Sequence, residues 1–141
     1  MSSHHFVKVG QEPSVWVMDV HFDPEVLGSL LEWCPLLYVC EPAIEKVLSE
    51  GVKIDVALTN EAEKEEVNEW LQNQFPIEIR VVKEFFSELV GKVNAGNQSP
   101  IHILGWKLKD GKAFLLQLPE AARAGRILFA EGRRIRAVHS S

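Results

Sequence analysis

Several polar residues of this chain stand directly after short apolar runs, where a ligand could be bound. Glu41 follows the apolar residues 36–40, and Thr59 and Asn60 follow the mostly apolar residues 54–58. The next carboxylates offer the oxygen ligands that divalent cations prefer. They are Glu61, Glu63, Glu65 and Glu66. The alternative interpretation of this cluster is the solvated, acidic start of a helix, and no Asp-x-Asp spacing favours the cation.

Lysine residues farther along the chain could receive a phosphate. Lys107 and Lys109, with Lys112, follow Gly105 at the end of another apolar segment. Phosphate sites commonly add a glycine-rich loop whose backbone amides point at the ligand. No such loop accompanies these lysines, so the phosphate hypothesis depends on the lysine charges alone.

A strand–helix–strand pattern positions these polar residues. Residues 36–40 and the mostly apolar residues 54–58 are strand-like, and between them Pro42 suits the first turn of a helix that Gly51 ends. So short a unit predicts a βαβ crossover with parallel strands. In parallel α/β sheets, ligands bind beyond the carboxyl ends of the strands, which here carry Glu41 and Asn60.

The same alternation of strands and helices continues on both sides of this unit. Further strands are predicted over residues 15–20, 77–82 and 100–105. Further helices are predicted over about residues 23–34, 61–74 and 83–95. The alternating apolar residues of 77–82 indicate a strand near an edge of the sheet. Residues 127–130 and 134–138 resemble a hairpin, and residues 107–126 give no clear pattern.

The sequence therefore predicts a single α/β domain over residues 1–141. Its fold class is a three-layer sandwich with a mostly parallel, Rossmann-like sheet and an antiparallel C-terminal hairpin. The composition, with 46% hydrophobic and 25% charged residues, is ordinary for one globular domain.

Charge is distributed unevenly along the chain. Residues 1–100 contain seventeen acidic and seven basic residues, whereas residues 101–141 contain eight basic and three acidic residues. Such opposed ends could attract an anion or pair one copy with another, the alternative being ordinary solvated surface. We expect a homodimer, with Trp70 on an otherwise polar helix as a candidate contact. The basic end lacks interleaved aromatic residues, so nucleic-acid binding is not expected.

The cellular location is predicted from what the sequence lacks. No apolar run approaches the roughly 20 residues that would span a bilayer, and the N-terminal residues show no secretion signal. Of the two cysteines, Cys34 and Cys40, the second falls in a predicted buried strand. Neither has the motif or the partner base of a nucleophile. We therefore expect a reduced, cytoplasmic protein with no membrane association.

Three segments resemble one enzyme family in the same order along the chain. They read HHFVKVGQEPS, LGSLLEWCPLLYVCEPAIEKVLSEGVKIDVAL and IHILGW. They are similar to the catalytic domain of thiamine pyrophosphokinase, and closest to its form in Bacteroidetes-type bacteria, over roughly residues 4–106. The resemblance implies pyrophosphoryl transfer from ATP to thiamine, with Mg²⁺ held by carboxylates at strand ends.

The chain departs from the motifs of that family at nearly every strand end. Glu41 stands where the family has an Asp-Gly pair, and Asn60 and Ala62 replace both carboxylates of its Gly-Asp-x-Asp-Ser motif. Asp55, just before that motif, is kept. Gly105 is what is left of its Gly-Gly-Arg-x-Asp-His loop, and its Asp-Lys-Thr-Asp-x-Glu segment has no counterpart. The C-terminal β-sandwich that helps the family to bind thiamine is also expected to be missing.

These departures predict a non-catalytic binding or assembly module. The alternative is an active, nucleotide-dependent pyrophosphokinase-type transferase that acts on thiamine or a related alcohol. No catalytic residue, metal site or cofactor is predicted, and Mg-ATP would be the cofactor only under the alternative. The candidate pocket for a small molecule of unknown identity comprises Glu41, Asp55, Thr59, Asn60, Gly105, Lys107 and Lys109.

Overall fold

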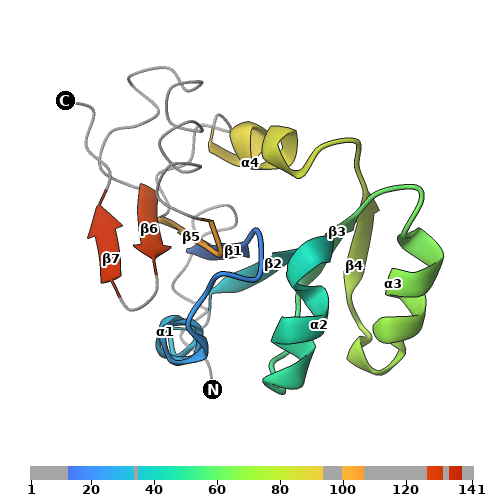
Figure 1. Cartoon of the computed structure of the whole chain (residues 1–141), viewed down its shortest axis with the longest axis horizontal. Helices are drawn as coiled ribbons and strands as arrows, with labels where there is room; N and C mark the ends of the chain where they lie inside the picture. Colours follow the sequence, from blue (N-terminus) through green and yellow to red (C-terminus); the bar gives the residue numbers. More distant parts are fainter. Residues whose placement is uncertain (1–12, 34, 94–99, 107–126, 132–133, 138–141) are drawn as a thin grey trace.

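Strands joined by helices form one sheet with helices on both of its faces (Figure 1). The structure is a computed structural model that describes residues 13–33, 35–93, 100–106, 127–131 and 134–137. The strands are β1 (Ser14–Val17), β2 (Leu36–Cys40), β3 (Val56–Thr59), β4 (Glu78–Val81), β5 (Ile101–Leu104), β6 (Ile127–Glu131) and β7 (Arg134–Ala137). The helices are α1 (Pro24–Leu31), α2 (Glu41–Ser49), α3 (Lys64–Trp70), the 3-10 helix η2 (Gln72–Gln74) and α4 (Phe85–Val93).

The order of the strands shows how the chain winds. Within the described residues the sheet has the order β4-β3-β2-β1-β5-β6-β7, and every neighbouring pair is parallel except β6 and β7. Strands β2 to β4 extend the sheet on one side of β1, and β5 and β6 extend it on the other. The predicted α/β sandwich with a mostly parallel sheet is therefore confirmed, and so is the edge position of β4.

The C-terminal strands are described only in part. β7 pairs with β6 in the antiparallel direction, so that Arg134 stands opposite Glu131. Residues 132–133 between these strands lie outside the described residues, as does the segment 107–126, for which the sequence shows no clear pattern.

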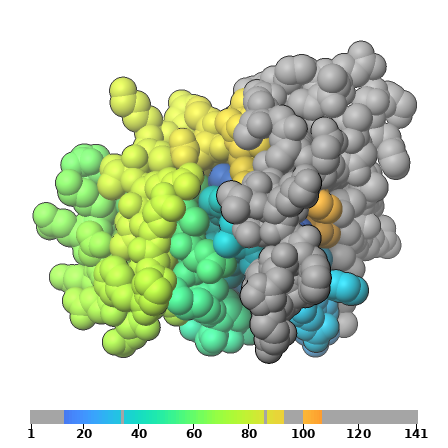
Figure 2. All heavy atoms as spheres, turned by 180° about the vertical axis from the view of Figure 1, so that it is seen from behind, coloured from blue at the N-terminus to red at the C-terminus, as the bar shows by residue number. Residues whose placement is uncertain are grey.

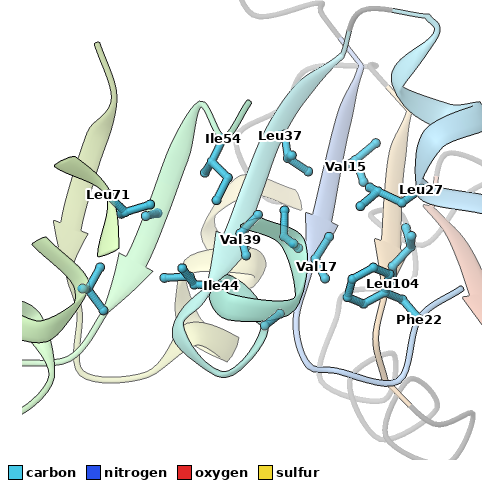
Figure 3. Packing of buried hydrophobic residues seen from close by; sticks show 14 of the residues in the cluster. Val15, Val17, Phe22, Leu27, Leu37, Val39, Ile44, Ile54, Leu71 and Leu104 are labelled. Carbon is cyan, nitrogen blue, oxygen red and sulfur yellow. The ribbon is translucent and has the colours of Figure 1, made fainter. Parts of the chain in front are cut away.

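One face of the sheet packs against α1, α2 and α3. A single cluster of buried apolar side chains fills the space between these layers (Figure 3). It includes Val15 and Val17 of β1, Leu37 and Val39 of β2, Leu27 of α1, Ile44 of α2, Val67 of α3 and Leu71. Each fully buried Val, Leu or Ile stabilises the fold by about 1.5–3 kcal/mol, so this cluster is a main source of stability.

The opposite face packs against α4. Leu89 of α4 is completely buried in a second cluster with Trp16 of β1 and Ile103 of β5. The rings of Trp16 and Tyr38 stack in parallel, with their centroids 4.2 Å apart. Since both faces are covered, the central strands are apolar on both sides, which is typical of parallel sheets.

Some predicted boundaries are wrong, for local reasons. β1 ends at Val17 and not at residue 20, because Asp19 Oδ1 accepts a hydrogen bond from Val20 N (2.7 Å) and forms a local alternative to the strand ladder. The helix predicted over residues 61–74 begins only at Lys64 and is broken after Trp70, whose side chain is partly buried against the first cluster.

A lysine of α2 holds the loop that follows β1. Lys46 Nζ donates hydrogen bonds to the carbonyl oxygens of Val20 (2.6 Å) and Phe22 (2.8 Å). The same ammonium lies 4.2 Å from the centroid of the Phe22 ring, within the range of a cation–π interaction. The loop is therefore fastened to α2 by charge-assisted contacts.

None of the helices in the described part of the chain has the length and apolar character that crossing a bilayer requires.

Replacing Lys46 by Met keeps the aliphatic length of the side chain and removes its hydrogen bonds to the two carbonyl groups. We expect Lys46→Met to lower the free energy of unfolding by about 1.5 kcal/mol, because hydrogen bonds from a charged donor are lost. Urea denaturation followed by tryptophan fluorescence measures this change. The matched control is Lys83→Met at an exposed position, for which we expect a change within about 0.5 kcal/mol. Equal effects of the two substitutions would contradict this role of Lys46.

Candidate functional site

The winding of the chain marks one place at the carboxyl edge of the sheet. Successive strands run outward from β1 as far as β4, and the chain then returns to place β5 on the other side of β1. Ligands of doubly wound sheets bind at such a switch point, beyond the carboxyl ends of the two strands. Here these ends carry Asp19, after β1, and Gly105, after β5.

The backbone of the loop after β1 fills this switch point. Gly105 has a positive φ of 96°, and a Cβ added to it would lie 2.5 Å from Asp19 N and 2.9 Å from Asp19 C. His21 forms an antiparallel bridge with Gly105, and Met18 N donates a hydrogen bond to Leu104 O (2.8 Å). Only glycine permits so close an approach in this conformation, so Gly105 has a structural role at the switch point.

Glu41 begins α2 at the carboxyl end of β2, as the sequence predicts. The carboxylate is partly buried, and both desolvation and neighbouring carboxylates raise its pKa above the ordinary value for Glu. Among these neighbours the charges of Glu63, Glu66 and Glu45 act more strongly than that of Asp19. The surroundings of Glu41 are therefore electrostatically negative and favour a neutral or positively charged group there.

Thr59 and Asn60 lie at the carboxyl end of β3. Thr59 is completely buried, and Asn60 Oδ1 accepts a hydrogen bond from Glu63 N (2.9 Å). This bond stabilises the turn before α3, which is a common role of Asn before a helix. A hollow of about 590 Å³ lies next to Asn60, lined by Asn60, Glu61, Ala62, Val81, Val82 and Lys83.

Asp55 lies at the amino ends of the parallel strands, whereas the other described candidates lie at their carboxyl ends. It precedes β3, and its Oδ2 accepts a hydrogen bond from Leu37 N (2.8 Å) at the start of β2. The length of β3, about 3.3 Å per residue, separates it from Asn60. The expectation that Asp55 shares a pocket with Glu41 and Asn60 is therefore corrected, because Asp55 lies before the amino end of β3 whereas Asn60 follows its carboxyl end.

The two lysine candidates, Lys107 and Lys109, lie outside the described residues. Within the residues that are described, no three His, Cys, Asp or Glu side chains are arranged so that they could hold a metal ion.

The sequence did not predict that Asp19 and Lys46 fix the loop after β1 at the carboxyl ends of the strands. Asp19 was assigned to the first strand, although its type favours turns and could have indicated the strand end. Lys46 gives no signal in the sequence, because its partners are backbone carbonyls more than twenty positions away.

Comparison of the chain with protein-family models, with curated proteins and with solved structures finds no match.

Adding a methyl group at the switch point should destabilise the fold. We expect Gly105→Ala to lower the free energy of unfolding by at least about 2 kcal/mol, since the new Cβ overlaps the Asp19 backbone and φ is positive. The control is Gly28→Ala in α1, where a Cβ meets no atom within 4 Å and helix propensity predicts a gain of about 0.5–1 kcal/mol. Urea denaturation of the two variants and of wild type measures both changes in the free energy of unfolding. A neutral Gly105→Ala would contradict the close contact described here.

The raised pKa of Glu41 predicts a pH-dependent effect of Glu41→Gln. The native protein binds the Glu41 proton more tightly than the unfolded chain does, so wild-type stability falls as the pH rises through the raised pKa. A glutamine at position 41 stays neutral at every pH, so the variant does not lose this stability. We expect the variant to be more stable than wild type by on the order of 0.3 kcal/mol at neutral pH, with no gain below about pH 4. Urea denaturation at several pH values tests this, with exposed Glu50→Gln as the control. A gain that grows toward acid pH would contradict it.

Proposed function

We propose that this chain is a non-catalytic binding or assembly module on a scaffold that resembles the catalytic domain of thiamine pyrophosphokinase. The observation that carries the proposal is the filled switch point. The Asp19 backbone lies against Gly105 at the place where doubly wound sheets hold their ligands. Lys46 fastens the following residues Val20 and Phe22, so a nucleotide would have to displace a fixed loop.

The role of Asn60 supports the same proposal. The resemblance aligns Asn60 with a carboxylate that holds Mg²⁺ in the family, whereas here its Oδ1 is used in a hydrogen bond to Glu63 N. A neutral amide engaged in this way supplies little of the negative charge with which a carboxylate would balance Mg²⁺. This hydrogen bond gives Asn60 a structural role in the turn before α3, which supports the proposal.

One observation favours the alternative of an active nucleotide-dependent transferase. Glu41 and Asp19 follow adjacent strands, and the charge of Asp19 is close enough to contribute to the raised pKa of Glu41. A negative edge of this kind could attract a divalent cation together with a nucleotide, as Mg-ATP. We place this alternative second, because Asp55, the other carboxylate that the resemblance keeps, lies at the amino ends of the strands, away from Glu41 and Asp19.

The proposal includes a reducing, cytoplasmic location. Cys40 is a free cysteine in the buried strand β2, and burial together with the Asp19 charge raises the pKa of its thiol. A thiol of this kind is a packing group and not a reactive one, which suits a compartment where cysteines stay reduced.

Isothermal titration calorimetry separates the two functions. We expect no saturable heat when Mg-ATP, thiamine or thiamine diphosphate is titrated to millimolar concentration into the full chain. Saturation at micromolar to submillimolar Mg-ATP would overturn the proposal in favour of the alternative. In that case Glu41→Ala should abolish the heat, while the exposed control Glu50→Ala should retain it.

A further inference from the structure

Strand β4 lies at one end of the strand order. Among the residues that the structure describes it pairs with β3 alone, and the backbone amides of Glu78 and Val82 donate hydrogen bonds to Asp55 O (3.1 Å) and Thr59 O (2.7 Å). Backbone groups of successive strand residues face opposite neighbours, so the N–H and C=O groups of Ile79 and Val81 face away from β3. Such an edge is a template on which another strand can form hydrogen bonds.

The side chains along this edge alternate in a pattern in which reversal about the central residue keeps the apolar positions and exchanges the two opposite charges. Residues 77–81 are apolar, acidic, apolar, basic and apolar, with Ile79 at the centre. Val81 is 46% exposed, and Phe75, just before the strand, is 61% exposed. Glu78 and Arg80 form an ion pair on the exposed surface of the same strand. Apolar and charged groups are therefore available in symmetric positions.

We propose that two copies of the chain pair through β4 in the antiparallel direction, about a two-fold axis at Ile79. In this arrangement Glu78 stands opposite the partner's Arg80, and Arg80 opposite the partner's Glu78. Ile77 stands opposite the partner's Val81, and Ile79 stands opposite the partner's Ile79. The acidic and basic groups of one copy thus complement those of the other, as a two-fold interface requires.

The backbone favours the same register. Ile77, Ile79 and Val81 are the residues whose backbone groups face away from β3, and the axis at Ile79 places them opposite one another. They form hydrogen-bonded pairs with Cα atoms about 5.5 Å apart, whereas Glu78 and the partner's Arg80 come as close as about 4.5 Å. Cross-strand charge pairs at this separation are favourable.

Other registers lose one or both of these features. A shift by one residue places outward backbone groups opposite groups that already bond to β3. An axis at Arg80 still pairs the outward backbone groups of Ile79 with those of the partner's Val81, but it sets Arg80 against the partner's Arg80 and loses the pairs of opposite charge. The register centred on Ile79 therefore satisfies the hydrogen bonds and the charges together.

The surface on this side of the molecule is open to a partner. The space-filling view shows the yellow-green atoms of the segment around β4 at the surface (Figure 2). Val81 also lines the hollow beside Asn60, so pairing through β4 places the second copy next to that hollow. This inference rests on the proposed function and specifies its assembly part as a homodimer with one continuous sheet.

Sedimentation equilibrium of the full chain tests the dimer. We expect a mass of twice 15.9 kDa for wild type and a monomer for Val81→Pro. Proline at position 81 removes an N–H that faces away from β3, so the bonds of β4 to β3 are kept. Far-UV circular dichroism and the unfolding midpoint check that this variant is folded. A monomeric wild type, or a folded Val81→Pro that still dimerises, would overturn the proposal.

Charge exchange tests the register independently of proline. Glu78→Arg places like charges opposite each other at two symmetric positions, and we expect the dimer dissociation constant to rise at least about fivefold. The double variant Glu78→Arg with Arg80→Glu restores complementary pairs and should recover most of the wild-type affinity. Failure of the double variant to recover would exclude the register centred on Ile79, even if Val81→Pro should unfold. Calorimetry with Mg-ATP reports on the proposed function separately, so the two proposals can fail independently.

Discussion

The structure depends on the hydrogen-bonded pairing of β1 with its two neighbours in a fully buried setting. All four residues of β1 are buried, and the strand pairs in parallel with β2 and β5. Its polar residue, Ser14, has a partner there, since the indole nitrogen of Trp16 donates a hydrogen bond to Ser14 Oγ (3.2 Å). Two covered faces require helices on both sides, so the three layers follow from the apolar character of the centre.

Local features of the sequence predicted the fold class because they act over short distances. The run at residues 36–40 is apolar at every position, and it forms β2 with those bounds. Asp23 was assigned to the start of a helix, and its Oδ1 accepts a hydrogen bond from Glu25 N (2.8 Å). The alternation in residues 77–82 indicated an edge strand, and β4 is an edge strand. Each of these conclusions needed only a few neighbouring residues.

The candidate site was less predictable because it depends on which strands become neighbours. The sequence pointed to the ends of β2, β3 and β5 but did not include the end of β1, which lies beside β5 although the two strands are more than eighty positions apart. Asp55 was a candidate through the family resemblance alone, and β3 separates it from Asn60 because it lies before the amino end of that strand. The contact of Gly105 with the Asp19 backbone has no local signature, since glycine also ends many loops.

The strand order also determines when the strands of a chain that is still being synthesised can pair. One side of β1 can pair with β2 as soon as residues 36–40 are available, but its other side needs residues 101–104. Residues 41–104, from the end of β2 to the end of β5, take on the order of 3–13 s to synthesise at about 5–20 residues per second. During that interval the central strand β1 of the nascent chain has an unpaired side. Chaperone contact during translation would therefore matter most between the emergence of β2 and that of β5.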